Sequence, residues 1–259
     1  MATDQETVLI TGASAGIGLE LARCFARGKS NLVLVARREE KLRELAAEIG
    51  DQHGVAVTVL PKDLADPAAP LEIRERLDEQ QVAIDVVVNN AGFGEVGMLA
   101  ALPVQRQVDM VQVNVAGLTH LTRLFLRDMI RRRRGGILNV GSTAAFQPGP
   151  GMAVYYASKA YVLSFTEALA EELRGTGVTA TCLAPGPTVT EFGAVSGIEH
   201  SRLFKLGAMD AAQVAKAGYR GFRRGKTIVI PGPLNKLGAV SVRAVPRTVV
   251  RKIVKWLNG

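Results

Sequence analysis

The 259-residue sequence predicts an α/β fold in which a doubly wound parallel sheet of about seven strands carries helices on both faces. Short apolar runs alternate with helical patterns along the chain, as in repeated right-handed βαβ units. Several runs, such as Val86–Val88, are entirely apolar, which is typical of central parallel strands covered on both faces. Because no repeat, low-complexity segment or linker composition interrupts this alternation, we expect one domain over residues 1–259.

The predicted strands are short runs rich in β-branched and aliphatic residues. In chain order they are Thr7–Thr11, Asn31–Ala36, Ala56–Leu60, Ile84–Asn89, Gly136–Gly141, Val178–Leu183 and Thr227–Ile230. The predicted helices have apolar residues at helical spacing between these strands. They are Gly16–Arg27, Glu39–Ile49, Ala68–Gln80, Val104–Arg134, Met152–Arg174 and Ala211–Arg223.

Composition and charge limit the other classes of function. The net charge is +8, and aromatic residues make up only 5% and do not alternate with the basic clusters, so we expect no nucleic-acid partner. Two cysteines give neither a disulfide framework nor metal-ligand spacing, and no metal site is predicted. Residues 1–7 resemble no secretory signal and no run resembles a membrane span, so the expected location is cytoplasmic.

A glycine-rich turn joins the first strand to the first helix. Its sequence, Thr11-Gly-Ala-Ser-Ala-Gly-Ile-Gly18, has the spacing G-x3-G-x-G instead of the commoner G-x-G-x-x-G. Glycines at such a junction let the backbone approach a pyrophosphate at the helix N-terminus, as in Rossmann-type folds. The turn therefore predicts a dinucleotide site.

The end of the second strand indicates which dinucleotide. The chain reads Val35-Ala-Arg-Arg38 there, with no acid until Glu39. A carboxylate at this point would bind the ribose hydroxyls of NAD, whereas an arginine pairs with the 2′-phosphate of NADP. NADP(H) with Arg37 is favoured; the alternative is that both arginines are solvated residues at a strand end.

Three residues predict proton-transfer chemistry. Tyr155 and Lys159 are one helical turn apart and so share a face. An ammonium beside a phenol lowers the pKa of the phenol, so we expect a depressed Tyr155 pKa and a general acid or base. Ser142 follows a strand, at the edge where open α/β sheets bind ligands.

The order of these motifs resembles the short-chain dehydrogenase/reductase family in its single-domain, NADP-preferring form, over about residues 7–232. The matching residues share family-like intervals. They are Thr11 to Gly18, Asp63-Leu64, Asn89-Asn-Ala-Gly92, Asn114, Ser142, Tyr155-x3-Lys159 and Pro185-Gly-x3-Thr190.

The resemblance implies an oxidoreductase acting on a carbonyl/alcohol pair. Tyr155 would exchange the proton, Lys159 would hold the nicotinamide ribose, Ser142 would orient the substrate oxygen, and Asn114 would anchor a water in a proton relay. The resemblance also implies the cofactor contacts. These are Gly12, Ser14, Gly16, Ile17, Gly18, Arg37, Asp63, Leu64, Asn90, Ala91, Gly92, Tyr155, Lys159, Pro185, Gly186, Thr188 and Thr190.

The resemblance places substrate contacts after Ser142, in the Gly92–Gly97 loop and after Thr190. The apolar residues there are Ala144, Ala145, Phe146, Met152, Phe192, Val195, Leu203 and Phe204. They suit an apolar carbonyl compound, with residues 190–208 as a mobile lid. We also expect a homodimer or homotetramer.

Residues 233–259 extend beyond the usual end of the family. Val249, Val250, Ile253, Val254 and Leu257 form an apolar stripe beside basic residues. Such a helix can lie on an anionic membrane, but covering the protein's own surface or a subunit contact is favoured. Two other functions stay open: reduction of 3-oxoacyl groups on a carrier protein or CoA, and a catalytically silent NADP-binding regulatory protein.

Overall fold

The predicted doubly wound sheet is confirmed. The computed structural model describes residues 5–205 and 207–258, leaving out the side chains at 200, 203, 205 and 243. Seven parallel strands lie in the order β3-β2-β1-β4-β5-β6-β9. They are β1 (Thr7–Thr11), β2 (Asn31–Ala36), β3 (Val57–Pro61), β4 (Val86–Asn89), β5 (Gly135–Val140), β6 (Val178–Leu183) and β9 (Ile228–Val229). Two further strands, β7 (Thr188–Val189) and β8 (Met209–Asp210), form a separate parallel pair.

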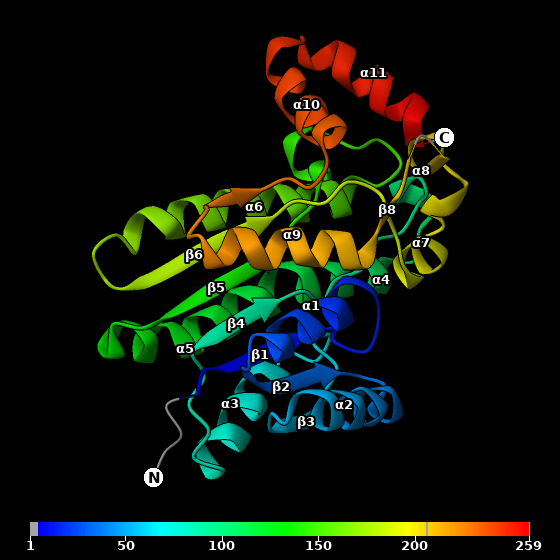
Figure 1. Ribbon diagram of the computed structural model, residues 1–259. Helices are drawn as coiled ribbons and strands as arrows, with labels where there is room; N and C mark the ends of the chain where they lie inside the picture. Colours follow the sequence, from blue (N-terminus) through cyan, green and yellow to red (C-terminus); the bar gives the residue numbers. More distant parts are fainter. Residues whose placement is uncertain (1–4, 206, 259) are drawn as a thin grey trace.

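The helices cover both faces of the sheet, with short turns between them (Figure 1). The α-helices are α1 (Gly16–Arg27), α2 (Glu39–His53), α3 (Ala69–Glu79), α4 (Val104–Val111), α5 (Leu118–Arg132), α6 (Ala153–Glu172), α7 (Glu191–Ser196), α8 (Arg202–Lys205), α9 (Ala211–Arg223), α10 (Pro233–Ser241) and α11 (Arg247–Asn258). The short helices are η1 (Leu99–Ala101), the π-helix η2 (Gln112–Gly117), η3 (Thr143–Phe146), η4 (Ile198–His200) and η5 (Val242–Ala244).

Side-chain alternation along the strands divides the core into two layers. Val8 and Ile10 of β1 pack with α1, α2 and α9, whereas Leu9 packs with α3, α5 and α6 on the other face. All three side chains are fully buried, since a central parallel strand has no solvated face. Because every pairing in the seven-stranded sheet is parallel, the carboxyl ends of these strands lie at one common edge.

The predicted helix Val104–Arg134 is wrong as a single regular helix. The chain passes from α4 through the π-helix η2 into α5. Asn114 lies in this wider turn, with its side chain buried and bonded to residues outside the helix. A π-turn inserts one extra residue per turn and so changes the direction of side chains, as often occurs at functional sites.

Two groups of helices lie apart from the central layers. Figure 1 shows α7 and α8 beside the edge toward which the arrows of β1 and β4 point. It also shows α10 and α11 standing together at the top of the molecule, beyond the β9 edge. Within residues 5–205 and 207–258, no helix is both long and apolar enough to pass through a bilayer.

Candidate active site

The strand order reverses between β1 and β4, and hydrogen bonds join the carboxyl ends of these two strands. Thr11 Oγ1 accepts hydrogen bonds from the backbone N–H of Asn90 and of Ala91, both at 3.0 Å. The Asn90 side-chain amide donates to the carbonyls of Thr11 at 2.9 Å and Gly12 at 3.1 Å. In open α/β sheets, this reversal leaves a crevice at the carboxyl ends of the strands.

The turn after β1 needs its glycines. Gly12 has φ +64°, in the left-handed region. A Cβ on Gly18 would lie 2.3 Å from the Gly12 carbonyl oxygen, and one on Gly16 would lie 2.9 Å from Thr190 Cγ2. The bare backbone therefore packs α1 against the turn and leaves the first amides of α1 beside the crevice, where an anionic group can bind.

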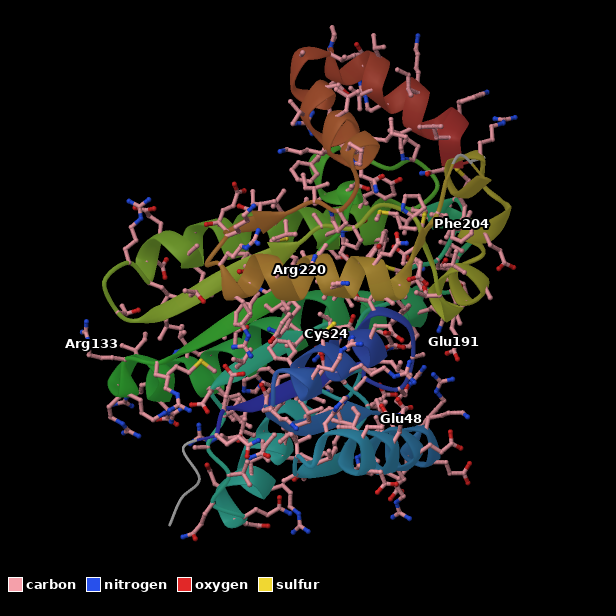
Figure 2. All side chains as sticks on the ribbon, in the orientation of Figure 1. Cys24, Glu48, Arg133, Glu191, Phe204 and Arg220 are labelled. Atoms are coloured by element: carbon pink, nitrogen blue, oxygen red, sulfur yellow. The ribbon has the colours of Figure 1, made fainter. Side chains whose placement is uncertain are left out.

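Two arginines follow β2 and have different surroundings. Arg37 lines the crevice; its guanidinium lies 3.9 Å from the Asp63 carboxylate, and both side chains are exposed. Arg38 instead donates to Ser14 Oγ at 3.1 Å and forms an ion pair with Glu191 at 2.7 Å. Glu191, labelled in Figure 2, is the first residue of α7, so this ion pair joins α7 to the glycine-rich turn.

Tyr155 and Lys159 are buried one turn apart on α6. The Lys159 ammonium donates to the Val140 carbonyl at 2.9 Å, and its Nζ lies 5.7 Å from the centre of the Tyr155 ring. The Tyr155 hydroxyl shares a hydrogen bond with Ser142. Ser142 is held in turn by the Ala144 N–H, which donates to its Oγ at 3.1 Å. Hydroxyl, phenol and ammonium therefore meet at the crevice.

The expected depression of the Tyr155 pKa is wrong for this structure. Burial raises the pKa of Tyr155 to about 12, and the hydrogen bond with Ser142 only partly opposes this change. The ammonium faces the ring and the Val140 carbonyl, and burial lowers the pKa of Lys159 to about 8. Desolvation is the largest cause of both pKa shifts, because both groups lie away from water.

Asn114 lies behind the crevice. Its Nδ2 donates to the Phe93 carbonyl at 2.9 Å and to Ser158 Oγ at 3.0 Å, while its Oδ1 accepts from the Phe93 N–H at 3.1 Å. A Cβ on Gly92 would lie 3.0 Å from Asn114 Oδ1 and 3.4 Å from Lys159 Nζ. Asn114 thus fixes the loop after β4 close to Lys159.

Most of the predicted site residues surround one cavity of about 310 Å³. Those that line it are Gly12, Gly16, Ile17, Arg37, Asn90, Ala91, Gly92, Ser142, Tyr155, Lys159, Pro185, Gly186, Thr188 and Thr190. Five lie outside this lining. Ser14 contacts Arg38, Gly18 packs against Gly12, Asp63 faces Arg37 in solvent, Leu64 belongs to the core, and Asn114 supports the loop.

The other side of the cavity is apolar. Its predicted lining residues Ala144, Phe192, Val195 and Phe204 are all present, and the Phe192 ring centre lies 5.4 Å from that of Tyr155. Of the remaining predicted contacts, Met152 is buried in a cluster with Tyr155, whereas Ala145 and Phe146 border a different hollow. The Leu203 side chain lies outside the part that the structure describes.

The model of the family "short chain dehydrogenase" matches residues 6–199, about three quarters of the chain. The chain belongs to this family.

Individual relatives agree with this assignment. Sulfoacetaldehyde reductase 2 of Chromohalobacter salexigens is 41% identical over 194 residues, which cover 72% of this chain and 74% of the relative. The structure of a short-chain dehydrogenase from Sphingobium yanoikuyae in complex with NADPH is 34% identical, with a TM-score of 0.83 and coverage of 92% and 93%. A bulky-bulky ketone specific alcohol dehydrogenase from Comamonas testosteroni is 30% identical, with a TM-score of 0.79 and 93% of both chains covered.

Some neighbours of the site in this short-chain dehydrogenase could not be inferred from the sequence. Tyr156 lines the cavity beside Tyr155, and its hydroxyl donates to Asn258 Oδ1 at 3.0 Å. Asn258 Nδ2 donates to the Pro150 carbonyl at 3.1 Å. No local pattern links Tyr156 to Asn258, because they are 102 residues apart. Nor did the sequence indicate that Glu191 would pair with Arg38.

Proposed function

We propose that the protein is an NADP(H)-dependent oxidoreductase that interconverts a carbonyl and a secondary alcohol on an apolar substrate, with Tyr155 as general acid and base. The observation that carries this proposal is the convergence of Ser142, Tyr155 and Lys159 on a cavity that also contains Arg37. Phosphate-binding and proton-transfer groups thus face one space, as a nicotinamide enzyme requires.

The cavity fits NADP(H). At Gly12, Gly16 and Gly18 of the turn an added Cβ would lie within 3.0 Å of Asn90, Thr190 or the Gly12 carbonyl oxygen, so the turn keeps the bare backbone that dinucleotide-binding folds present to a pyrophosphate. Arg37 offers an exposed guanidinium, with its nearest carboxylate 3.9 Å away, to a 2′-phosphate. The similar structure from Sphingobium yanoikuyae contains NADPH. When bound, the dinucleotide supplies or accepts the hydride.

The proton chemistry follows from the polar groups of the site. A Tyr155 pKa of about 12 keeps the phenol protonated near neutral pH, so it can donate to a carbonyl oxygen during reduction. Ser142 would hold that oxygen. The Lys159 ammonium would stabilise the phenolate that remains, since its Nζ is 5.7 Å from the ring centre. Asn114 would keep the Gly92–Phe93 loop in place.

The substrate class is proposed from the apolar side of the cavity. Phe192, Val195 and Phe204 suit a hydrophobic ketone, whose reduction gives a secondary alcohol. We place the mobile cover at residues 190–208, which include α7, and the Arg38–Glu191 ion pair would hold it closed. Apolar ketones and aldehydes with NADPH, followed by nicotinamide absorbance, would identify the substrate.

Tyr155→Phe tests the proposal. Loss of the phenolic proton should reduce turnover by about 10²–10⁴-fold and leave the NADPH dissociation constant within about twofold. Tyr161→Phe is the matched control, because Tyr161 is on the same helix but bonds Thr119 at the surface. Unchanged turnover in Tyr155→Phe would remove the phenol from the mechanism.

A further inference from the structure

The basic residues of the chain are concentrated toward its C-terminus. Residues 211–259 contain eleven Lys and Arg and no Asp or Glu. Residues 1–210 hold 21 basic and 24 acidic residues, a net charge of −3. Six of the eleven C-terminal cations lie in residues 233–259, the segment of α10 and α11. The C-terminal part of the chain is therefore strongly positive, and its last 27 residues carry six cations and no acidic residue.

The same two helices expose large apolar side chains. Sixteen such side chains are exposed among the described residues, and six of them lie on α10 and α11. They are Leu234, Leu237, Val240, Val249, Ile253 and Trp256. A monomeric protein surface normally scatters such residues singly, so this concentration indicates an interaction surface. Figure 1 shows both helices projecting beyond the sheet.

The rest of the protein covers only part of the apolar stripe of α11. Val250 and Val254 are 4% and 2% exposed and pack on the cluster around Met152 and Tyr156. Val249 and Ile253, from the same stripe, are 43% and 49% exposed. Contact with the protein's own surface therefore leaves two of the five stripe residues, Val249 and Ile253, exposed.

Trp256 extends the exposed part of the α11 stripe. Its side chain is 58% exposed, and the Arg202 guanidinium lies 4.7 Å from the ring centre. Arg251, Lys252 and Lys255 on the same helix are also exposed. Exposed apolar side chains, an aromatic ring at their margin and cations alongside are the features of a helix that lies in a membrane interface.

The charge distinguishes this surface from a subunit contact. Another exposed apolar group, residues 98–111, carries one basic and one acidic residue and has no such bias. Two copies of the α10–α11 surface would instead bring like charges together. We propose that α10 and α11 bind the surface of an anionic lipid bilayer. This inference does not depend on the reaction that the enzyme catalyses.

The single tryptophan makes the proposal directly measurable. The full chain is mixed with vesicles of phosphatidylcholine and phosphatidylglycerol (3:1) or of phosphatidylcholine alone, and sedimentation is combined with Trp256 emission. We expect retention on the anionic vesicles, a blue shift of the emission, and release as salt screens the charges.

Two variants with equal changes in net charge separate the tail from overall charge. One is Arg251→Glu, Lys252→Glu, Lys255→Glu on α11. The control is Lys216→Glu, Arg220→Glu, Arg224→Glu, at and just after α9, where Figure 2 labels Arg220. All six side chains are exposed. The α11 variant should lose about a hundredfold in vesicle affinity, and the control less than about fivefold.

A third variant tests the apolar part. Val249→Ser with Ile253→Ser should weaken retention and reduce the blue shift while leaving far-UV circular dichroism unchanged, because both side chains are exposed. Two outcomes of the vesicle experiments would overturn the proposal: no retention on anionic vesicles at low salt, or equal losses of affinity in the two charge variants. Dimers that form with rising protein concentration and that only this serine variant abolishes would also overturn it. So would binding to polyglutamate that is as tight as binding to vesicles and occurs without the emission shift.

Discussion

Burial changes the proton affinities of Tyr155 and Lys159 in opposite directions. Each side chain loses water around its charged form, so the pKa of the phenol rises to about 12 and that of the ammonium falls to about 8. At neutral pH both groups carry their protons. These protonation states are the ones that the proposed proton donation from Tyr155 requires, with a cation nearby to stabilise the phenolate.

The lowered Lys159 pKa predicts how stability depends on pH. The unfolded chain keeps this proton up to its ordinary pKa of 10.5 but the folded chain only to about 8, so stability should rise with pH between these values. Wild type should gain about 2 kcal/mol relative to Lys159→Met between pH 7.5 and 9.5. Urea unfolding of the cofactor-free proteins measures this difference; parallel curves would contradict the lowered pKa.

Arg37 predicts the choice of dinucleotide. Arg37→Asp replaces a cation with an anion beside the expected 2′-phosphate, so NADPH should bind at least about a hundredfold more weakly, and NADH less than about threefold. Arg43→Asp makes the same charge change on α2 and is the control. Titration of both nucleotides measures the effect, and equal losses would refute the assignment.

Helix α6 connects the site to the end of the chain. Tyr155 and Lys159 face the cavity, while the neighbouring Tyr156 bonds Asn258 at the end of α11. Val250 and Val254 of α11 pack on the same cluster as Met152 and Tyr155. The C-terminal helix therefore supports the first turn of α6 from outside the family-matched region.

Asn258→Ala should show how much this contact contributes to the free energy of unfolding. It leaves the Tyr156 hydroxyl and the Pro150 carbonyl without their partner, which should cost about 1–3 kcal/mol of unfolding free energy. The exposed Thr248→Ala on the same helix should change stability by less than about 0.5 kcal/mol. In a double-mutant cycle, Asn258→Ala and Tyr156→Phe should be non-additive; additive losses would show that the pair does not interact.

At the scale of the whole molecule, the cavity joins the two halves of the sheet. Thr11 and Gly12 come from β1, Asn90 and Ala91 follow β4, and Tyr155 comes from beyond β5. A ligand held by all of them binds only the folded chain, so its binding energy adds to the stability of the whole fold.

NADPH should consequently protect the protein against unfolding. At a hundred times its dissociation constant it should add about 2.7 kcal/mol, and NADH at the same concentration should add less. Thermal unfolding with each nucleotide measures both effects. A melting temperature insensitive to NADPH would mean that the crevice does not bind it.

The sequence by itself determined the doubly wound α/β fold class, most of its strands and helices, and the glycine turn. The spacing of apolar residues along a chain follows the buried faces of its strands and helices. Thr7–Thr11 and Gly16–Arg27 were therefore predicted with their observed bounds. Glycines at 12, 16 and 18 could be identified because they stand together at a strand-to-helix junction, although the residues they pack against, such as Thr190, are distant in the sequence.

Only the tertiary structure decided the properties that depend on distant residues. The Tyr155 pKa is set by burial under several elements, the π-turn at Asn114 by contacts with Phe93 and Ser158, and the Arg38–Glu191 pair by segments 153 residues apart. The split of the α11 stripe likewise depends on how much of it the body covers. Desolvation and packing are sums over three-dimensional neighbours, which spacing along a chain does not specify.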